Sequence, residues 1–279
     1  MNQKSYENSM FGKLYLIPTP IGNINDITLR ALDTLKEVDI IYAEDTRETI
    51  SLLKKYDINK KVESCHKYSE MKNKDKIIKI LTEGKNIGYV TDRGTPLISD
   101  PGNVIVEECI KNDINVIALP GPNALLPAIN MSGLSNEKFL FYGFLNSKKS
   151  ICRKELKELK DLKYTLIFYE SPFRVLDTLK IMKEELGDRK IALVREISKI
   201  HEEIIRNNIS KIIDNCDKIK GEIVIVVDGK KEEKNVQYNY ENDIKELLKE
   251  GFSKKDAIKM IAEKNNISKN KLYEEYKEL

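Results

Sequence analysis

The sequence predicts an α/β protein with two α/β lobes followed by a small helical region, and three observations predict it. Short apolar segments of strand type alternate with amphipathic segments at helical spacing. The alternation stops at a Gly-Leu-Ser-Asn stretch, 133–136, and then starts again, as at a hinge between two lobes. A charged stretch, 228–237, is followed by helical patterns only. The predicted domains are an N-terminal α/β lobe at 12–133, a C-terminal α/β lobe at 137–229 and a small helical tail at 238–279.

The first lobe opens with a short buried strand, 13–17, which ends at Pro18. The first helix is predicted over 28–38, because leucines recur there at helical spacing and Thr28 or Asp26 can cap it. The same criteria predict strands at 39–42, 86–91 and 115–119 and helices at 47–55, 70–83, 103–111 and 122–131. Strands that alternate with helices in this way predict a mostly parallel sheet that is covered on both faces.

The second lobe has strand patterns that follow one another directly. Strands are predicted at 138–143, 164–169, 190–195, 202–206 and 222–228, and helices at 151–160, 173–186 and 209–216. Because no helix separates 190–195 from 202–206, the sheet is predicted to be mixed. The tail has helical patterns at 241–250, 253–264 and 268–278, with Ser253 and Ser268 as N-caps. It can be a helix–turn–helix that binds nucleic acid or a small docking or dimer-packing element, and we favour the latter.

The composition indicates a cytoplasmic globular protein. Its 279 residues suffice for two cores, and 41% hydrophobic with 33% charged residues is a soluble composition. No apolar run approaches the roughly 20 residues that span a bilayer, and the polar N-terminus lacks the features of a signal peptide. A net charge of +3 does not by itself indicate nucleic-acid binding. No metal-ligand spacing is present and reduced thiols are expected, given the scattered Cys65, Cys109, Cys152, Cys216, His66 and His201.

Three turns rich in proline and glycine, at 18–23, 92–102 and 120–124, each follow a predicted strand. Ligands of open parallel sheets bind beyond the carboxyl ends of the strands, which is where these turns lie. Glycine permits close approach to the backbone and proline restricts the turn, so the three together predict a ligand site of main-chain groups. The dinucleotide, P-loop and nucleophile-elbow motifs are absent from the chain.

Several longer segments carry a resemblance to a known family. Segments 43–47 (AEDTR), 90–102 (VTDRGTPLISDPG) and 119–124 (LPGPNA) resemble those of the tetrapyrrole-methylase-like superfamily, the class III S-adenosylmethionine methyltransferases. Segments 168–174, 195–199 with 201–203, and 221–227 narrow the resemblance to the ribosomal small-subunit RNA methyltransferase I family. The resemblance runs from about residue 12 to 229, and the helical tail is also similar to the C-terminal region of that family.

The resemblance implies S-adenosylmethionine in the cleft between the lobes and a homodimer. It also implies an activity, methylation of a cytidine 2′-hydroxyl in the decoding region of 16S rRNA, with the small ribosomal subunit as partner. By position, the cofactor is expected to meet Pro18, Gly94, Thr95, Asn123 and Ala124, and from the second lobe Phe168 and Tyr169. Plausible contacts to RNA phosphates or sugars are Arg47, Arg93, Arg174, Arg195 and Lys199.

The chain departs from the family pattern at a few positions. Arg93 stands where alanine is usual, and its guanidinium can crowd the cofactor turn or reach an RNA phosphate. Asn123 replaces a serine of similar hydrogen-bonding capacity, and Phe173 replaces a histidine. His66 is retained from a histidine-containing run, but Tyr68 and Ser69 follow it. These changes weaken any mechanism that depends on a histidine.

Methyl transfer to a ribose requires the hydroxyl to lose its proton, and a general base contributes typically about 10²–10⁴-fold. Candidates near the expected cleft are Glu44, Asp45, Glu170, Glu196 and His66, of which we select Glu170. Each can instead be a structural partner; Asp45, for example, can cap the helix that follows it.

Two other functions are compatible with the sequence. One is a methyltransferase of tetrapyrroles or another small molecule with the same cofactor site, against which segments 44–47 and 168–174 and the tail argue. The other is a non-catalytic module that binds RNA or the ribosome, which Arg93 beside the cofactor turn keeps open.

Overall fold

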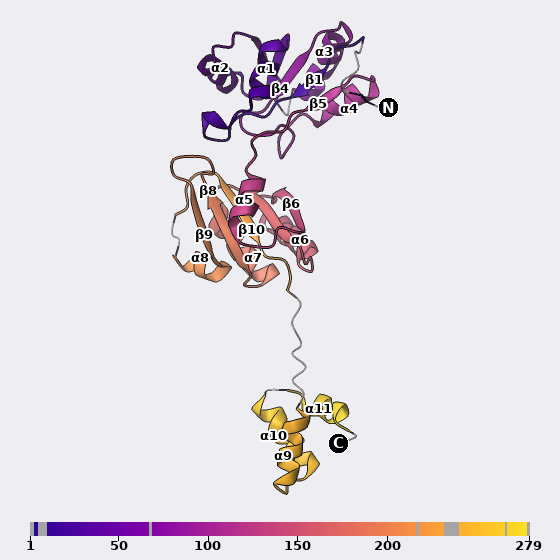
Figure 1. The fold of residues 1–279 in the computed structure, drawn as a ribbon, viewed down its shortest axis with the longest axis vertical. Coiled ribbons are helices and arrows are strands. Elements are labelled where there is room, and N and C mark those ends of the chain that lie inside the picture. The colour runs from indigo at the N-terminus through magenta and orange to yellow at the C-terminus, as the bar shows by residue number, and fades with distance from the viewer. Residues whose placement is uncertain are drawn as a thin grey trace. The chain divides into compact units, whose positions relative to one another are not determined.

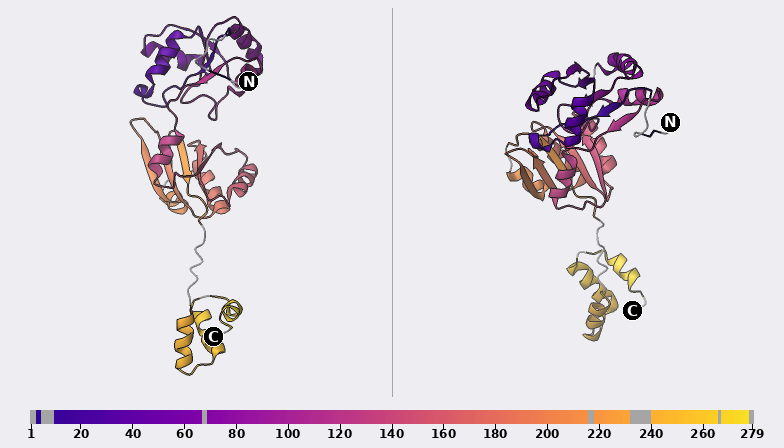
Figure 2. Two further views of the ribbon diagram at one scale, coloured as in Figure 1. Left: turned by 45° about the vertical axis from the view of Figure 1, so that its right-hand side comes forward. Right: turned by 45° about the horizontal axis from the view of Figure 1, so that its top comes forward.

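The structure, a computed structural model, describes residues 3–4, 10–66, 69–215, 218–231, 240–265 and 267–277. The chain divides into two compact units, Met1–Lys230 and Lys231–Leu279, each with a hydrophobic core of its own (Figure 1). Both predicted α/β lobes lie in the first unit, and Figure 2 shows this unit from two further directions.

The first sheet is parallel throughout the described residues, with the strand order β3-β2-β4-β1-β5. Its strands are β1 (Leu14–Leu16), β2 (Ile40–Ala43), β3 (Lys61–Ser64), β4 (Ile87–Val90) and β5 (Val116–Ala118). Helices α1 (Leu29–Glu37) and α2 (Thr46–Lys55) cover one face, and α3 (Glu70–Thr82) and α4 (Asn103–Lys111) cover the other (Figure 1). The prediction of a parallel sheet covered on both faces is confirmed, although β3 was not predicted.

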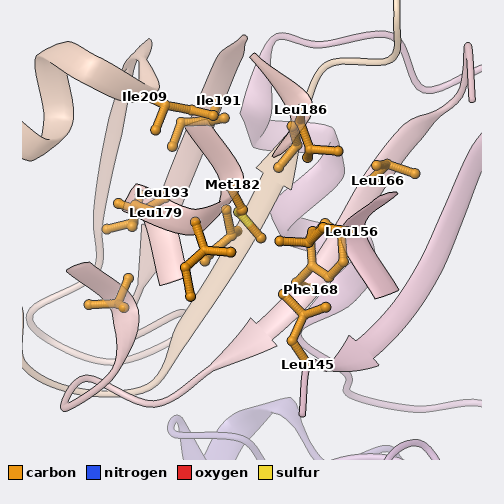
Figure 3. Packing of buried hydrophobic residues seen from close by; sticks show 14 of the residues in the cluster. Leu145, Leu156, Leu166, Phe168, Leu179, Met182, Leu186, Ile191, Leu193 and Ile209 are labelled. Carbon is orange, nitrogen blue, oxygen red and sulfur yellow. The ribbon is translucent and has the colours of Figure 1, made fainter. Parts of the chain in front are cut away.

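The second sheet is mixed, as predicted, with the order β6-β7-β10-β8-β9. Within the described strands of this sheet, only the pair β6–β7 is parallel. The strands are β6 (Phe139–Phe144), β7 (Thr165–Glu170), β8 (Lys190–Arg195), β9 (Glu203–Asn208) and β10 (Ile223–Val227). One face packs against α6 (Lys149–Leu159), α7 (Val175–Leu186) and α8 (Ile209–Asn215). Figure 3 shows this core, in which Leu179 and Met182 of α7 lie over Phe168 of β7 and Leu193 of β8.

Helix α5 (Leu125–Ser132) was predicted as part of the first lobe, but it covers the other face of the second sheet. Ala128 and Ile129 are buried there against Val194 of β8 and Val224 of β10. The predicted hinge at 133–136 therefore follows the crossing between the lobes, which takes place at the turn before α5. The hinge was predicted too late in the chain because Gly133 ends helix α5. It adopts a left-handed conformation (φ 73°) at the C-cap, and in a sequence such a glycine looks like a domain boundary.

The second unit contains α9 (Glu241–Lys249), α10 (Lys254–Lys264) and α11 (Lys269–Glu275), close to the three predicted helices. The Ser253 side chain accepts a hydrogen bond from Asp256 N, as predicted for an N-cap, whereas Ser268 occupies the N-cap position of α11 without a side-chain cap bond. The hydrophobic core of this second unit consists of Ile244, Ile258, Ile261, Ala262 and Leu272. In neither unit is any described helix long and apolar enough to cross a membrane.

Candidate functional site

A cleft of ≈ 410 Å³ lies between the turns after β4 and β5 and the loops of the second sheet. This volume is within the range of small-molecule sites, roughly 300–1,000 Å³. Its lining is Ile21, Arg93, Gly94, Thr95, Ile98, Ser99, Asp100, Asn123, Ala124, Phe144, Tyr169, Glu170, Ser171, Pro172, Ile197, Gly221, Glu222, Ile223 and Val224. The second and third proline- and glycine-rich turns therefore form one wall, and the first turn contributes Ile21.

Hydrogen bonds join the three turns into one rim. Thr19 and Gly94 exchange two backbone hydrogen bonds, each 2.9 Å long, which tie the first turn to the second. The Thr95 hydroxyl donates to the Pro122 carbonyl at 2.9 Å and ties the second turn to the third. Gly94 has a φ of 81°, and a Cβ there would lie 3.2 Å from Ile21 Cγ2, so this close approach requires glycine.

Of the predicted cofactor residues, the cleft brings together Gly94, Thr95, Asn123, Ala124 and Tyr169. Asn123 Oδ1 also accepts a hydrogen bond from Leu126 N at 3.0 Å, which satisfies a free N–H at the start of α5.

Pro18 and Phe168 do not line the cleft, contrary to prediction. Pro18 is buried behind the third turn, where a Cβ added to Gly121 would lie 2.5 Å from Pro18 Cβ. Phe168 is fully buried in the core beneath the sheet (Figure 3). Successive residues of a strand point to opposite faces, so Phe168 and Tyr169 cannot both face the cleft.

Tyr169 is the aromatic centre of the second wall. Its ring packs edge-on against Phe141 at 4.9 Å and Phe144 at 5.6 Å between centroids. Burial, with a further contribution from Asp100, raises the pKa of Tyr169 to about 12, although the backbone N–H groups of Leu125 and Ala124 act in the opposite direction. Tyr169 is therefore a protonated hydroxyl at neutral pH.

Glu170, the predicted general base, is held by hydrogen bonds within the protein. One carboxylate oxygen accepts from Ser171 N at 2.7 Å and the other from the Thr178 hydroxyl at 2.6 Å. Arg174 Nε lies 3.6 Å from the first oxygen, and only 1% of the Glu170 side chain is exposed. Glu170 thus fixes the loop between β7 and α7, and its geometry does not suit proton abstraction from a substrate in the cleft.

The other proposed bases do not line the cleft. Asp45 caps α2 by accepting from Arg47 N at 2.8 Å, and its hydrogen bonds with Arg47 lower its pKa to about 2. The pKa of Glu196 is lowered by the backbone N–H of Glu222 and by Lys199, which weakens Glu196 as a base. The remaining two candidates, Glu44 and His66, are likewise absent from the lining of the cleft.

Besides Glu222, the lining contains a second carboxylate that was not predicted, Asp100. It follows two non-glycine residues in left-handed conformations, Leu97 (φ 70°) and Ser99 (φ 69°). Burial raises the pKa of Asp100 to about 6, with further contributions from the negative charges of Glu44 and Asp92. Ser-Asp-Pro-Gly is also an ordinary turn sequence, and only the fold shows that its carboxylate faces the cleft.

Two of the predicted RNA contacts meet at the mouth of the cleft. Arg93, in the first lobe, forms an ion pair with Glu222, in the second. Lys199 Nζ lies 3.0 Å from Glu222 Oε2 and 2.9 Å from Glu196 Oε1. Arg93 and Lys199 also line a neighbouring polar groove of ≈ 340 Å³, together with Lys55.

The other three predicted RNA contacts are elsewhere. Arg47 is exposed and paired with Asp45. The Arg174 guanidinium donates to the carbonyls of Leu145 at 3.0 Å and Asn146 at 3.2 Å, so it supports a loop. Arg195 pairs with Glu203.

Among the described residues, no group of three or more His, Cys, Asp or Glu side chains could hold a metal ion. Cys65, Cys109 and Cys152 are buried, and burial raises the pKa of each thiol. Cys216 and Tyr68, named in the sequence analysis, lie outside the described residues.

Comparisons with known proteins agree with this architecture. The family model of the tetrapyrrole (corrin/porphyrin) methylases matches residues 13–213. Ribosomal RNA small subunit methyltransferase I of Bacillus subtilis is 44% identical over 277 residues, which are 96% of this chain and 95% of the relative. The protein of the same name from Thermotoga maritima is 46% identical over 221 residues, which are 78% of this chain but 99% of the relative.

Solved structures share the fold at low sequence identity. The methyltransferase CobJ has a TM-score of 0.59 at 17% identity and covers 78% of this chain and 94% of its own. The uroporphyrin-III C-methyltransferase of Thermus thermophilus, complexed with S-adenyl homocysteine, has a TM-score of 0.57 at 18% identity, with coverages of 78% and 97%.

Proposed function

This chain belongs to the tetrapyrrole methylase family and, within it, to the ribosomal RNA small subunit methyltransferase I family, and from that membership we propose its reaction. It transfers the methyl group of S-adenosylmethionine to the 2′-hydroxyl of a cytidine in the decoding region of 16S rRNA. The observation that carries the proposal is the cleft, whose two walls come from different lobes and whose lining includes Arg93, paired with Glu222. We include in the proposal that it acts in the cytoplasm as a homodimer.

S-adenosylmethionine is the methyl donor, and the cleft has the features that such a molecule requires. Gly94 (φ 81°) and Gly221 (φ 93°) line it in left-handed conformations that favour glycine, and a Cβ at Gly221 would lie 2.4 Å from Glu196 Oε1. Phe144, Ile197 and Val224 supply apolar surface, and Asp100 supplies a carboxylate that suits a cationic molecule. When bound, the donor supplies a methyl group activated by a positively charged sulfur.

The protein's own task is then to align the acceptor and to remove its proton. The rim formed by the three turns positions the donor through Gly94, Thr95, Asn123 and Ala124. Tyr169, fixed between Phe141 and Phe144, closes the opposite wall. A ribose hydroxyl has to enter from the mouth, where Arg93 and Lys199 can pair with the phosphates of an irregular or single-stranded RNA segment.

The relatives favour RNA over a tetrapyrrole as acceptor. Proteins that are 39–46% identical to this chain are named for small-subunit ribosomal RNA. The tetrapyrrole-related titles belong to structures only 14–18% identical, which share the fold alone.

The test is transfer of a radiolabelled methyl group to small ribosomal subunits from a strain that lacks the modification, with uroporphyrinogen as the alternative acceptor. We expect label in the RNA, and digestion to nucleosides should recover it as 2′-O-methylcytidine. Label found on bases alone, or on uroporphyrinogen and not on RNA, would refute the proposal. Sedimentation equilibrium at micromolar concentration tests the dimer.

A further inference from the structure

We propose that the polar groove beside the cleft binds the phosphodiester backbone of the RNA segment that flanks the methylated nucleotide, and that Lys55 is one of its phosphate contacts. The inference rests on the proposed function and extends it, because it gives the RNA a path along the first lobe. It adds to Arg93 and Lys199 a cation that does not line the cleft itself.

The groove has a volume of ≈ 340 Å³ and is built from four segments of the chain. These are the first turn, one face of α2, the second turn at Asp92 and Arg93, and Lys199 of the second lobe. Arg93 lines both the groove and the cleft, so the two hollows are adjacent. An RNA strand whose target nucleotide enters the cleft therefore has a continuation beside Arg93, where its flanking phosphates meet the groove.

Helix α2 turns a single face toward the groove. Glu48, Ser51, Leu52 and Lys55 line the groove, and their spacing of three and four residues places them on the same side of the helix. Leu53 lies on another side and is buried in the core of the first lobe. Lys55 is exposed, and it has no ion pair within the part of the chain that the structure describes. Its ammonium group is therefore available to a phosphate in the groove.

The loop that carries Lys199 is strained and seated closely against the first turn. Glu196 and Ser198 adopt φ values of 53° and 67°, which L-amino acids other than glycine rarely adopt. Asn23 N donates to Ser198 Oγ at 3.2 Å, and a Cβ at Gly22 would lie 2.4 Å from Lys199 Cγ. Only 21% of the Lys199 side chain is exposed. Such strain is retained where the surroundings enforce it and concentrates at functional sites, and here it fixes a cation at the groove.

The charged side chains that line the groove sum to a positive charge. The cations are Lys55, Arg93 and Lys199, and the acids are Glu48 and Asp92. Asp92 has a structural partner, because its Oδ1 accepts a hydrogen bond at 2.9 Å from the backbone N–H of the residue before α2. Glu48 lies in the first turn of α2, where an acidic side chain stabilises the helix. The groove therefore offers the lysine and arginine side chains that a nucleic-acid backbone requires.

Glu222 occupies the position of an anion between two of these cations. Its carboxylate pairs with Arg93, and its Oε2 lies 3.0 Å from Lys199 Nζ. A phosphate group also presents charged oxygens, so it fits between the same guanidinium and ammonium groups. The Glu222 side chain is 57% exposed, and ion pairs between exposed side chains stabilise little, so an RNA phosphate can take its place.

The test compares the full-length wild type with Lys55→Ala in methyl transfer to small subunits that lack the modification. We expect KM for the subunits to rise about three- to tenfold at low salt with kcat within about twofold, because the lost contact binds substrate and transition state equally. The dependence of log KM on the logarithm of salt concentration should become shallower by about 0.7, the value for one phosphate of a single strand. The dissociation constant of S-adenosylmethionine and the circular dichroism spectrum should be unchanged.

Two further variants of α2 sharpen the test. Lys54→Ala is the matched control, since Lys54 is an exposed lysine in the same helical turn but does not line the groove. It should leave KM within about twofold of the wild type and the salt dependence unchanged. Glu48→Gln removes an acid from the groove and should lower KM about two- to threefold, in the opposite direction from Lys55→Ala.

Photocrosslinking identifies what occupies the groove. Ser51 is exposed and lines the groove, so benzoylphenylalanine incorporated at this position should crosslink to 16S rRNA when small subunits are added. The same amino acid at position 54 should crosslink more weakly. A crosslink from position 51 to a ribosomal protein and not to RNA would show that the groove binds protein and would overturn the inference.

The kinetic results can overturn it as well. The same rise in KM for Lys54→Ala and Lys55→Ala would show that only the net charge of α2 matters, and an unchanged KM and salt dependence for Lys55→Ala would show that the RNA runs elsewhere. Failure of the proposed function gives a different result, because in that case the wild type itself yields no 2′-O-methylcytidine.

Discussion

At the residue scale, two carboxylates of the same cleft have opposite surroundings. Glu170 is enclosed by donors, which satisfy its oxygens and make it part of the framework. Asp100 lines the cleft, and burial together with the negative charges of Glu44 and Asp92 raises its pKa, although a hydrogen bond with the Thr91 side chain acts in the opposite direction. The same chemical group is therefore part of the framework at one position and open to a ligand at the other.

Replacing Glu170 by glutamine should therefore affect stability more than chemistry. The amide nitrogen cannot accept one of the two hydrogen bonds, and a buried polar group without its partner costs about 1–3 kcal/mol. In a domain of this size, this loss corresponds to a fall in Tm of about 2–4 °C per kcal/mol. Thermal unfolding and kcat, measured on the same preparation, check it: Tm should fall while kcat stays within about tenfold. Thr178→Val should show a comparable fall. If kcat falls a hundredfold while Tm is unchanged, Glu170 acts as the general base after all.

The pKa of Asp100 also predicts how stability depends on pH. Its value rises from 3.8 to about 6 on folding, so the native state binds more protons than the unfolded state between these limits. The favourable contribution is complete below about pH 4 and is lost as the pH rises through about 6. Asp100→Asn, which cannot ionise, should therefore be more stable than the wild type at pH 8, by on the order of 1–2 kcal/mol. Urea denaturation at pH 4 and pH 8 measures it; a variant less stable at pH 8 would contradict the assigned surroundings.

The turns that form the rim of the site could be predicted from the sequence, but the carboxylate that lines it could not. Gly94, Thr95, Asn123 and Ala124 could be predicted because turns at successive strand ends converge at one edge of a parallel sheet. Asp100 could not, because its importance depends on Glu44 and Asp92, which reach it only through the fold. Nor does the sequence show which faces of β7 are lined by Phe168 and Tyr169, because both are aromatic.

At the element scale, periodicity predicted most helices and strands, and the errors have physical causes. Strand β3 carries lysine, glutamate and serine at the edge of the sheet, so it lacks the apolar pattern of a buried strand. Helix α5 was recognised but assigned to the wrong lobe. A helical pattern shows that one face is buried, but it does not show against which sheet, and for α5 the buried face meets β8 and β10.

The β-bulge of β6, where its register with β7 shifts between Phe141 and Gly143, permits a sharp test of how the lobes hold Asp100. Gly143→Ala places a methyl group about 3.0 Å from Ser99 Oγ and also strains the backbone at a φ of 84°. Gly187→Ala is the matched control, since its φ is 87° but nothing lies within 4 Å of the added Cβ. Both variants should lose on the order of 1–2 kcal/mol of stability from the backbone. Only Gly143→Ala should also lower kcat, by about tenfold or more, since it displaces the loop that carries Asp100 into the cleft lining. Equal kcat values in the two variants would show that the contact has no catalytic importance.

At the scale of the whole molecule, the first unit is held together around the cleft from two sides. Ile21 of the first turn and Ile197 of the second lobe belong to one apolar cluster with α5. Beside it, Asn23 N donates to Ser198 Oγ at 3.2 Å. The ion pair between Arg93 and Glu222 crosses the mouth, but with both side chains at least half exposed it stabilises by at most about 1 kcal/mol. The apolar contact therefore contributes more than this ion pair to holding the lobes together, and the proposed pairing of Arg93 with RNA phosphates would cost little stability.

The second unit has its own core and its own set of helices, so its removal should leave the catalytic unit intact. A chain ending at Lys230 should fold, with a Tm within about 2 °C of the corresponding transition of the full protein, and should bind S-adenosylmethionine within about twofold. The docking role that the tail pattern favours predicts a higher KM for small subunits at unchanged kcat. Calorimetric unfolding, cofactor titration and steady-state kinetics check the three expectations. A truncated protein that folds but no longer binds the cofactor would show instead that the tail completes the methyl-donor site.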